Sequence, residues 1–372
     1  MSDPSAEVLI VGGGVAGLSI AMLAGRAGLP VRLLEAERTG FGASTRNQGW
    51  LHSGAAFADS APQTAAHCRD ALERTLRFCP ECVEPDTTDA LYIFSHADSD
   101  AGPWLRALRD LHIVAGEVTP NEAVQRIPIL ADSPIQHAFA LPDRAIMPER
   151  LLEKMRDEAE RHGARIETGA AVREVLLDNG RRVRGVRLGT GEAVAAQVVV
   201  LACGAGERLV PESGEPWQVQ DSAVEIVHLK NYLVGLKPAL GRGLICVMDE
   251  ERLNHVPHPP WSIVGIEHWT ATGDGRHEAT NEQALARLWE RFERFFPKVD
   301  RTRYELESWA GVTVQAMLPE QVQPGLEPLP VILDYGTYET GPKNLIGVFP
   351  GRLTLWSVVA DQTLELLKQY VD

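Results

Sequence analysis

One stretch near the N-terminus decides the fold: residues 7–35, with the sequence EVLIVGGGVAGLSIAMLAGRAGLPVRLLE. Its apolar start, Glu7–Val11, predicts a β-strand, and Leu18–Ala27 predicts a helix that ends at Gly28. A second apolar run, Val31–Glu35, predicts another strand, which closes on an acidic residue. The glycines between the first strand and the helix have the spacing G-x-G-x-x-G. In this strand–turn–helix setting, the pattern predicts a unit that binds a dinucleotide.

Each glycine of this turn has a separate physical task. Gly12 permits the tight turn, Gly14 lets the backbone approach a pyrophosphate, and Gly17 lets the helix pack close to the strand. The helix N-terminus directs free N–H groups and its positive dipole end at the phosphates. Glu35 can accept hydrogen bonds from ribose hydroxyls. The expected contacts at this end of the dinucleotide are Gly12, Gly14, Val15, Ala16, Gly17, Glu35 and Ala36.

Length and charge restrict the class of protein. The chain has 372 residues, more than the roughly 250–300 at which one core stops growing, so we expect two lobes. A formal net charge of −15 makes nucleic acid a poor partner. The five cysteines are scattered and do not resemble a disulfide framework. The acidic N-terminus lacks a secretory signal and no apolar run could span a bilayer, so we expect a cytoplasmic protein without a transmembrane segment.

The surroundings of the motif favour FAD over NAD. Enzymes that pass electrons from NAD(P)H to a flavin usually need a second nucleotide-binding unit, and no second G-x-G-x-x-G occurs in a strand–helix setting. The electron donor is therefore expected to be a small-molecule substrate, bound beside a permanently held cofactor. Residues 38–54, RTGFGASTRNQGWLHSG, are rich in small residues and amides and can lie against a flat ring system.

Four segments spread over the chain resemble the FAD-dependent oxidoreductases of the D-amino-acid oxidase superfamily. They are residues 42–49 (GASTRNQG), 169–174 (GAAVRE), 197–206 (QVVVLACGAG) and 344–354 (NLIGVFPGRLT). The superfamily includes glycine and sarcosine oxidases, glycerol-3-phosphate dehydrogenase and L-2-hydroxyglutarate dehydrogenase. The Gly-Arg-Leu-Thr of residues 351–354 is nearest to the Gly-Lys-Leu-Thr of the glycerol-3-phosphate branch.

The resemblance implies an enzyme that holds FAD and passes a hydride from its substrate to flavin N5. It implies that the backbone of Val172 meets the adenine, that a glycine turn after residue 201 passes the pyrophosphate, and that residues 351–354 close over the flavin. The implied contacts with FAD are Ser44, Thr45, Arg46, Asn47, Gln48, Leu51, Val172, Ala202, Gly204, Gly351, Arg352, Leu353 and Thr354.

The remaining patterns predict an α/β fold with an α+β second lobe. We expect a Rossmann-like FAD-binding domain from residues 1–81, 146–215 and 331–372, and an antiparallel-sheet substrate domain from residues 82–145 and 216–330. The first domain should contain helices at 148–162 and 354–370 and strands at 171–177, 182–188 and 192–201. The second should contain strands at 223–236, 244–248 and 262–267 and a helix at 281–296. The flavin site should lie between the lobes.

His52 and Arg352 are the candidate catalytic residues. His52 lies in a segment that resembles the Ile-His-x-Gly of the glycerol-3-phosphate and hydroxyglutarate branches, and an imidazole is suited to take the hydroxyl proton while hydride leaves a CH–OH carbon. Two alternatives remain: covalent attachment to the flavin, and a core histidine. Arg352, expected near flavin N1 and C2=O, would stabilise the negative charge of reduction; its alternative is a solvated surface arginine.

Three further observations bear on the substrate. Relatives present an arginine to the substrate anion in a Trp-x-Gly-x-Arg stretch, but this chain has Thr313 there. Either another cation, such as Lys343 or Arg352, replaces it, or the anionic group of the substrate is displaced or missing. His255, His258 and His268 form a cluster that is expected to line the pocket at His255 and His258. Its spacing gives little reason to expect a metal. The CPEC of residues 79–82 lacks the setting of a redox or zinc pair and is interpreted as structural.

The sequence therefore predicts an FAD enzyme that removes a hydride from the CH–OH carbon of a small hydroxy acid or related alcohol. Oxygen or a quinone-type acceptor would reoxidise the flavin. An amino-acid or secondary-amine oxidase or dehydrogenase is the first alternative. A non-catalytic flavin-binding subunit is the second.

Overall fold

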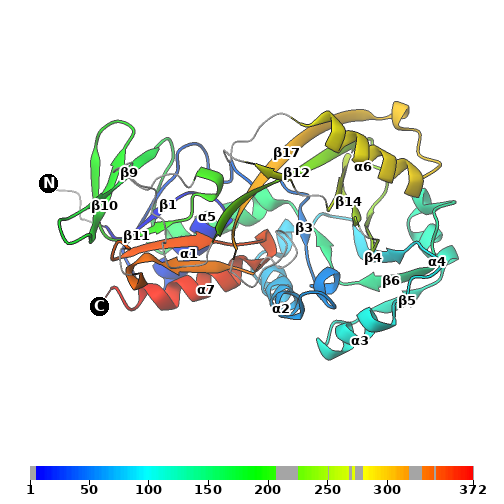
Figure 1. Cartoon of the computed structure of the whole chain (residues 1–372), viewed down its shortest axis with the longest axis horizontal. Helices are drawn as coiled ribbons and strands as arrows, with labels where there is room; N and C mark the ends of the chain where they lie inside the picture. Colours follow the sequence, from blue (N-terminus) through cyan, green and yellow to red (C-terminus); the bar gives the residue numbers. More distant parts are fainter. Residues whose placement is uncertain are drawn as a thin grey trace.

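A computed structural model describes residues 6–206, 225–249, 251–267, 270–272, 280–317, 329–338 and 341–371. They form two lobes, each built around its own sheet (Figure 1). The predicted α/β fold class is confirmed, whereas the residue boundaries of the two domains remain a prediction.

The first lobe contains the dinucleotide-binding unit. Its sheet has the order β18-β19-β11-β1-β2-β8, parallel apart from the edge strand β18. The strands are β1 (Ala6–Val11), β2 (Val31–Leu34), β8 (Arg165–Glu167), β11 (Ala193–Leu201), β18 (Val331–Asp334) and β19 (Leu345–Phe349). The central strand β1 is buried on both faces, as the helices and strands that cover a parallel sheet require.

Helices cover one face of this sheet and a small meander covers the other. The helices are α1 (Val15–Arg26), α5 (Pro148–Arg161) and α7 (Trp356–Leu367), with α2 (Pro62–Phe78) beside α7. Val8 and Ile10 point into the core with these helices, and Leu9 and Val11 point into the core with β9 (Val172–Leu177) and β10 (Val183–Leu188). Successive side chains of β1 point to opposite faces of the sheet, so β1 contributes residues to both cores of the lobe.

The second lobe has a mostly antiparallel sheet with the order β16-β12-β15-β14-β13-β4-β6-β5, with β17 paired to β12. Its strands are β4 (Thr88–Phe94), β5 (Gly116–Val118), β6 (His137–Leu141), β12 (Glu225–Lys237), β13 (Gly243–Val247), β14 (Leu253–His258), β15 (Trp261–Ile266), β16 (Thr270–Thr272) and β17 (Glu305–Met317). Helices α4 (Pro120–Arg126) and α6 (Glu282–Phe295) contribute to the core on one face, and α3 (Gly102–Asp110) to that on the other.

Two features join the lobes. The ladder of β12 and β17 runs without interruption from the pair Glu225–Met317 to the pair Lys237–Glu305, and these strands arch over the molecule in Figure 1. Val314 and Ala316 of β17 pack in the first lobe's core, whereas Val234 of β12 packs in the core that contains α6. The second link is the short pair of β3 (Trp50–Leu51) and β7 (Arg144–Ala145).

Most expected elements are confirmed within a few residues of their predicted ends. The helix expected at 354–370 begins at Trp356, because residues 353–355 form a 3-10 turn. The strand predicted at 223–236 begins outside the described residues. Strand β17 was not predicted as a strand, although its alternating residues 310–317 face a core at every second position.

Candidate active site

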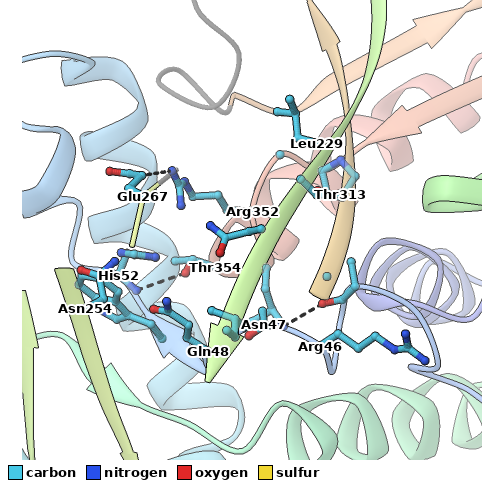
Figure 2. Close-up of a pocket in the computed structure, with 18 of the residues that line it drawn as sticks. Arg46, Asn47, Gln48, His52, Leu229, Asn254, Glu267, Thr313, Arg352 and Thr354 are labelled. Carbon is cyan, nitrogen blue, oxygen red and sulfur yellow. Dashed lines mark hydrogen bonds and ion pairs between the residues drawn. The ribbon is translucent and has the colours of Figure 1, made fainter. Parts of the chain in front are cut away.

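A cavity between the lobes brings together the segments that the sequence singled out. It has about 1260 Å³ of empty space, part of it open to solvent, and Figure 2 shows its interior. Of the positions predicted from sequence, those that line it are Val15, Ser44, Arg46, Asn47, Gln48, His52, Thr313, Gly351, Arg352, Leu353 and Thr354. Its position between the lobes is a common place for a ligand site.

The glycine turn has the tight geometry that its sequence predicts. Gly12 has a φ of +108°, and a Cβ there would lie 2.4 Å from the carbonyl oxygen of Ala202. A Cβ at Gly17 would lie 1.9 Å from the carbonyl oxygen of Gly12, so helix α1 could not pack so closely on β1 with any larger residue. The first N–H of α1, at Val15, donates to the hydroxyl of Ser44 at 3.0 Å. The turn and helix end form the cradle that a pyrophosphate requires.

Glu35 lies where β2 ends, beside the same turn. Its Oε2 accepts a hydrogen bond from the Gly13 N–H at 2.6 Å, and its Oε1 accepts one from the Glu37 N–H at 2.8 Å. These bonds fix the carboxylate, and each oxygen keeps a further lone pair for a ribose hydroxyl. Several predicted cofactor contacts do not line the cavity: Gly12, Gly14, Ala16, Gly17, Glu35, Ala36, Thr45, Val172, Ala202 and Gly204. Val172 starts β9 on the sheet face opposite α1, and Gly204 follows β11.

The loop between β2 and β3 is held by its own side chains. Thr45 donates to the Gly40 carbonyl at 2.6 Å, and the Asn47 amide donates to the carbonyls of Ala43 and Ser44 at 3.0 and 2.8 Å. The Asn47 Oδ1 accepts from the Gly49 N–H at 2.7 Å. The loop therefore has a defined shape, which places Asn47 and Gln48 along the cavity. Leu51, by contrast, is fully buried in β3 and does not line it.

His52 is buried and lines the cavity. Its ring lies 4.3 Å from the Trp50 ring and 5.6 Å from the Phe57 ring, between centroids. Its Nδ1 is buried and has no hydrogen-bond partner within the described residues. Burial, and then the positive charges of Arg352 and Arg252, hold the pKa of His52 well below its ordinary 6.5. The imidazole is therefore uncharged at neutral pH and able to accept a proton.

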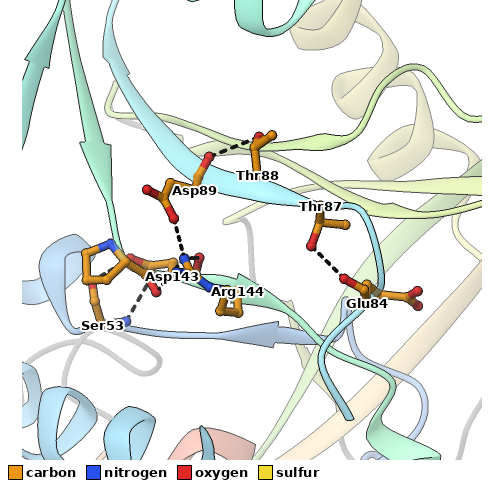
Figure 3. A network of polar contacts seen from close by, with 8 residues as sticks. Ser53, Glu84, Thr87, Thr88, Asp89, Asp143 and Arg144 are labelled. Atoms are coloured by element: carbon orange, nitrogen blue, oxygen red, sulfur yellow. Dashed lines mark hydrogen bonds and ion pairs between the residues drawn. The ribbon is translucent and has the colours of Figure 1, made fainter. Parts of the chain in front are cut away.

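A buried carboxylate, Asp143, anchors the segment around His52, which directly follows β3; Figure 3 shows its contact with Ser53. It accepts hydrogen bonds from the Trp50 indole at 2.9 Å, the Ser53 N–H at 3.0 Å and the Tyr92 hydroxyl at 3.0 Å, and another from the Ser53 hydroxyl. Burial raises the pKa of Asp143, and the hydrogen bonds from Ser53, Tyr92 and Trp50 oppose that rise. The donors at Trp50 and Ser53 flank His52, so Asp143 positions its backbone from both sides. No motif or spacing in the sequence indicated this role.

Arg352 is not a solvated surface residue. Its guanidinium lies 4.3 Å from the centre of the Phe57 ring and pairs with Glu267 at 3.3 Å. Burial lowers the pKa of Arg352, and the carboxylate of Glu267 opposes this. Arg46, the other predicted arginine, packs over Phe41 with its guanidinium 5.2 Å from the ring centre, and its side chain points away from the other labelled residues in Figure 2.

The structure adds two charged residues that sequence reasoning missed, Arg252 and Glu267. Arg252 pairs with Glu267 at 2.6 Å, and its guanidinium lies 5.6 Å from the Phe57 ring centre. Glu267 thus bridges Arg252 and Arg352 at the wall of the cavity. Although burial opposes it, the Glu267 carboxylate helps to raise the pKa of Arg252. The β14–β15 hairpin pairs Leu253 with Ile266, which brings Arg252 and Glu267 opposite each other, and only this register could have revealed the pair.

Alternate residues of β12 and β17 line another wall of the cavity. Leu229 pairs with Thr313 and Asn231 with Gly311 across the ladder, and all four face the cavity. Gln315 and Leu233 continue this wall. Thr313 therefore lies where the resemblance expected an arginine side chain, and no cation replaces it on these two strands among the described residues that line the cavity.

Other positions missed by sequence reasoning also line the cavity. They are Ala43, Trp50, Ala56, Phe57, Leu229, Asn231, Leu233, Asn254, Ile266, Gly311, Gln315 and Pro350. Asn254 is one of the polar residues of the cavity, and its buried Oδ1 has no hydrogen-bond partner within the described residues.

Three residues expected to meet the substrate lie elsewhere. His255 is fully buried, with Nδ1 bonded to the Gly243 carbonyl at 2.9 Å and Nε2 to the Ser262 hydroxyl at 2.8 Å, which makes it a core histidine. Lys343 is exposed beside Arg182 in the first lobe. Neither residue lines the cavity: His255 lies in the core and Lys343 is on the surface.

His258 is the third of these residues, and it contacts the backbone of the loop between β2 and β3. Its Nδ1 lies 2.6 Å from Glu84 Oε1, and its Nε2 lies 2.8 Å from the carbonyl oxygen of Gln48. Both nitrogens are therefore occupied away from the cavity lining. His268, the remaining histidine of the expected cluster, lies outside the described residues.

The thiols and possible metal ligands give no second site. Cys79 and Cys82 are buried, and their thiols are free. Across the described ranges, no group of three or more His, Cys, Asp or Glu side chains is arranged to hold a metal ion. In the same part of the chain, no helix is long and apolar enough to cross a membrane.

Fold and cavity together have the features expected of a flavoprotein: a tight glycine turn, an acid at the end of β2 and an amide-rich loop beside a buried histidine. One family profile, described as FAD dependent oxidoreductase (DAO), matches residues 7–346. The chain belongs to this family of FAD-dependent oxidoreductases, and its cofactor is FAD.

Sequence relatives include enzymes of glycerol phosphate oxidation. The chain is 35% identical over 207 residues to one subunit of the anaerobic glycerol-3-phosphate dehydrogenase of Escherichia coli K12, a region that covers 54% of this chain and 38% of that protein. It is 22% identical over 344 residues to alpha-glycerophosphate oxidase of Streptococcus pyogenes serotype M6, covering 84% of this chain and 54% of that protein. The matched regions thus span only about two fifths to one half of these curated relatives.

Solved structures with the same fold are named for different substrates. Glycine oxidase from Geobacillus kaustophilus has a TM-score of 0.76 at 19% identity, covering 99% of this chain and 95% of that one. L-proline dehydrogenase from P. horikoshii has a TM-score of 0.77 at 18% identity, covering 98% and 94%. These likenesses confirm the fold and leave the substrate to the chemistry of the cavity.

Proposed function

We propose that this enzyme oxidises the CH–OH carbon of a small hydroxy acid or related alcohol. The observation that carries the proposal is the cavity-lining imidazole of His52, with a buried Nδ1 that has no hydrogen-bond partner within the described residues. Bound FAD would supply the hydride acceptor, at N5, and oxygen or a quinone-type acceptor would reoxidise the flavin. Loss of hydride from an alcohol carbon also requires loss of the hydroxyl proton, and His52 is proposed to take it.

The wall around His52 supports this role. Part of the lowering of the His52 pKa comes, after burial, from the charges of Arg352 and Arg252. A substrate anion beside these arginines would offset their charge and make the imidazole more basic once substrate is bound. The His52 imidazole would therefore be most basic in the substrate complex, where the hydroxyl proton is removed.

The cofactor is proposed to lie along the segments already described. Gly12, Gly14 and the start of α1 would hold the pyrophosphate, and Glu35 the ribose. The amide-rich loop and residues 351–354 would hold the flavin. Arg352 would stabilise the negative charge that reduction places on the flavin. The acid–base role of His52 further requires that the flavin is not attached to it covalently.

Anaerobic mixing of the FAD-loaded enzyme with substrates tests the proposal. We expect 2-hydroxy acids to bleach the flavin absorbance, and we expect His52→Ala to slow that bleaching by about 100- to 10,000-fold. His255→Ala is the matched control, since this histidine does not line the cavity, and it should bleach at the rate of the unaltered enzyme. Acid precipitation should release FAD into the supernatant. Bleaching by amino acids alone would replace this function with amine oxidation, and a yellow pellet would make His52 the attachment point.

A further inference from the structure

Two arginines and one glutamate at the His52 end of the cavity form a charge arrangement that the proposed reaction leaves partly unexplained. Glu267 accepts from Arg252 at 2.6 Å and from Arg352 at 3.3 Å, so one carboxylate is shared between two guanidinium groups. The side chains are 14–16% exposed, and all three residues line the cavity. Two cations and one anion leave a single net positive charge in a largely dry wall.

This arrangement is held rigidly. Both guanidinium groups lie over the ring of Phe57, at 5.6 Å for Arg252 and 4.3 Å for Arg352. The backbone N–H of Glu267 also donates to the carbonyl of Arg252 at 2.9 Å across the hairpin. An anion that enters meets N–H donors already in place, so little conformational entropy is lost on binding.

The remaining polar wall carries no comparable charge among the described residues. Near His52 in Figure 2, the labelled neighbours are uncharged side chains such as Asn254 and Thr354, apart from Arg352 and Glu267 themselves. Arg46 also lines the cavity, but it extends from the loop that faces the start of α1. A charged substrate group beside His52 therefore has one compensating charge available, supplied by Arg252, Arg352 and Glu267 together.

We propose that Arg252 and Arg352 bind the carboxylate of the substrate, and that Glu267 restricts the site to monoanions and disfavours a phosphoryl dianion. This inference rests on the proposed function, and it selects hydroxy carboxylates over phosphorylated alcohols. In the oxidised enzyme, before reduction places negative charge on the flavin, one net positive charge balances one carboxylate. A second negative charge would remain unbalanced near the Glu267 carboxylate, where low exposure makes repulsion costly. Arg252 thereby replaces the arginine that is missing at position 313, and it does so from a different pair of strands.

The test measures binding of non-oxidisable anions to the oxidised, FAD-loaded enzyme by the change in the flavin absorbance spectrum. Acetate serves as the monoanion and sulfate as the dianion. We expect acetate to bind the unaltered enzyme more tightly than sulfate does. Arg252→Met should weaken acetate binding by at least about tenfold, while Arg252→Lys should restore most of it. Glu267→Gln, which removes the restricting charge, should strengthen sulfate binding by at least about tenfold.

Arg242→Met is the matched control, because Arg242 forms an exposed pair with Asp86 at 3.0 Å and does not line the cavity. Its acetate binding should equal that of the unaltered enzyme. The inference is overturned if Arg252→Met leaves acetate binding unchanged, or if sulfate binds the unaltered enzyme more tightly than acetate. A shifted flavin reduction potential in Arg252→Met with unchanged acetate binding would also overturn it. The Arg252 charge would then act on the flavin and not on the substrate carboxylate.

The two proposals fail separately. If amino acids and not hydroxy acids reduce the flavin, the alcohol-oxidation proposal fails while Arg252-dependent acetate binding stands. If hydroxy acids reduce the flavin but acetate binding does not depend on Arg252, only the carboxylate site fails.

Discussion

The backbone N–H of His52 donates a hydrogen bond to the hydroxyl of Thr354 at 3.2 Å, although the two residues are 302 positions apart in the chain. Both are buried at the cavity. The bond ties the segment after β3, which contains the proposed base, to the loop expected to close over the flavin. The two halves of the candidate site, from opposite ends of the sequence, are therefore held in one geometry.

Replacing Thr354 with alanine tests this tie. The change leaves a buried N–H at His52 without its acceptor, so we expect Thr354→Ala to lower the free energy of unfolding by about 1–3 kcal/mol. We also expect flavin reduction to slow by about tenfold as the base loses its position. Thr354→Ser keeps the hydroxyl and should retain both properties. Urea unfolding and anaerobic stopped-flow measurements give the two values, and equal behaviour of the alanine and serine variants would contradict the role.

Asp143 offers a second test of positioning. Asp143→Asn replaces an acceptor-only carboxylate with an amide whose N–H₂ group must face existing donors, which should cost about 1–3 kcal/mol of stability. We expect slower flavin reduction as well, because Trp50 and Ser53 flank His52. Asp89→Asn is the control: Asp89 pairs with Arg144 at 2.7 Å but is 56% exposed, so its loss should cost less than about 1 kcal/mol. Similar losses in both variants would remove Asp143 from the positioning of the site.

The glycine turn can be tested by adding one carbon. In Gly17→Ala the new Cβ would fall 1.9 Å from the Gly12 carbonyl oxygen, so α1 must move away from the turn. We expect a loss of about 1–3 kcal/mol in stability and markedly weaker FAD binding. At Gly42, a Cβ meets nothing within 4 Å, and Gly42→Ala should bind FAD normally. Titration of the apoprotein with FAD, followed by flavin fluorescence, distinguishes the variants. Normal binding by Gly17→Ala would refute the close packing.

The core histidine makes stability depend on pH. Burial lowers the pKa of His255 to about 4 in the folded protein, against 6.5 in the unfolded chain. Below pH 6.5 the unfolded chain takes up a proton that the fold excludes, so stability should fall as pH decreases from 6.5 toward 4, by roughly 3 kcal/mol from this group. His255→Leu should flatten that dependence, whereas the exposed His112→Asn should not. Urea midpoints across this range check it, and an unchanged slope in His255→Leu would exclude the mechanism.

The low pKa of His52 predicts a pH profile for catalysis. The imidazole must be unprotonated to act as base, and burial together with Arg352 and Arg252 keeps it so well below pH 6.5. We expect kcat/KM for a hydroxy acid to stay constant as pH falls from neutral through 6.5 and to decline only at lower pH. Arg252→Met removes one cause of the lowering and should move the decline to higher pH. A decline centred at 6.5 in the unaltered enzyme would show that the folded environment does not perturb His52.

The dinucleotide unit was predictable because its signals are local. The spacing of Gly12, Gly14 and Gly17 and the acid at Glu35 all lie within one strand–helix–strand unit, and each follows from backbone geometry. The contacts of Arg252, Glu267 and Asp143 were not predictable in the same way. Arg252 meets Glu267, and Asp143 meets Ser53, only through strand register and packing between segments distant in sequence. His255 was assigned to the pocket from its clustering, but a one-residue change along a strand reverses the face, and its side chain enters the core.

In the ladder of β12 and β17, alternate side chains face the cavity and the core. Leu229, Asn231 and Thr313 face the cavity, while the neighbouring Tyr232 and Val234 face the side of α6. Because main-chain hydrogen bonds hold the two strands together, cavity-facing side chains can be exchanged without altering the pairing or the core behind it. A new substrate preference can therefore arise from changes at the cavity-facing residues of these two strands while the inherited scaffold stays intact.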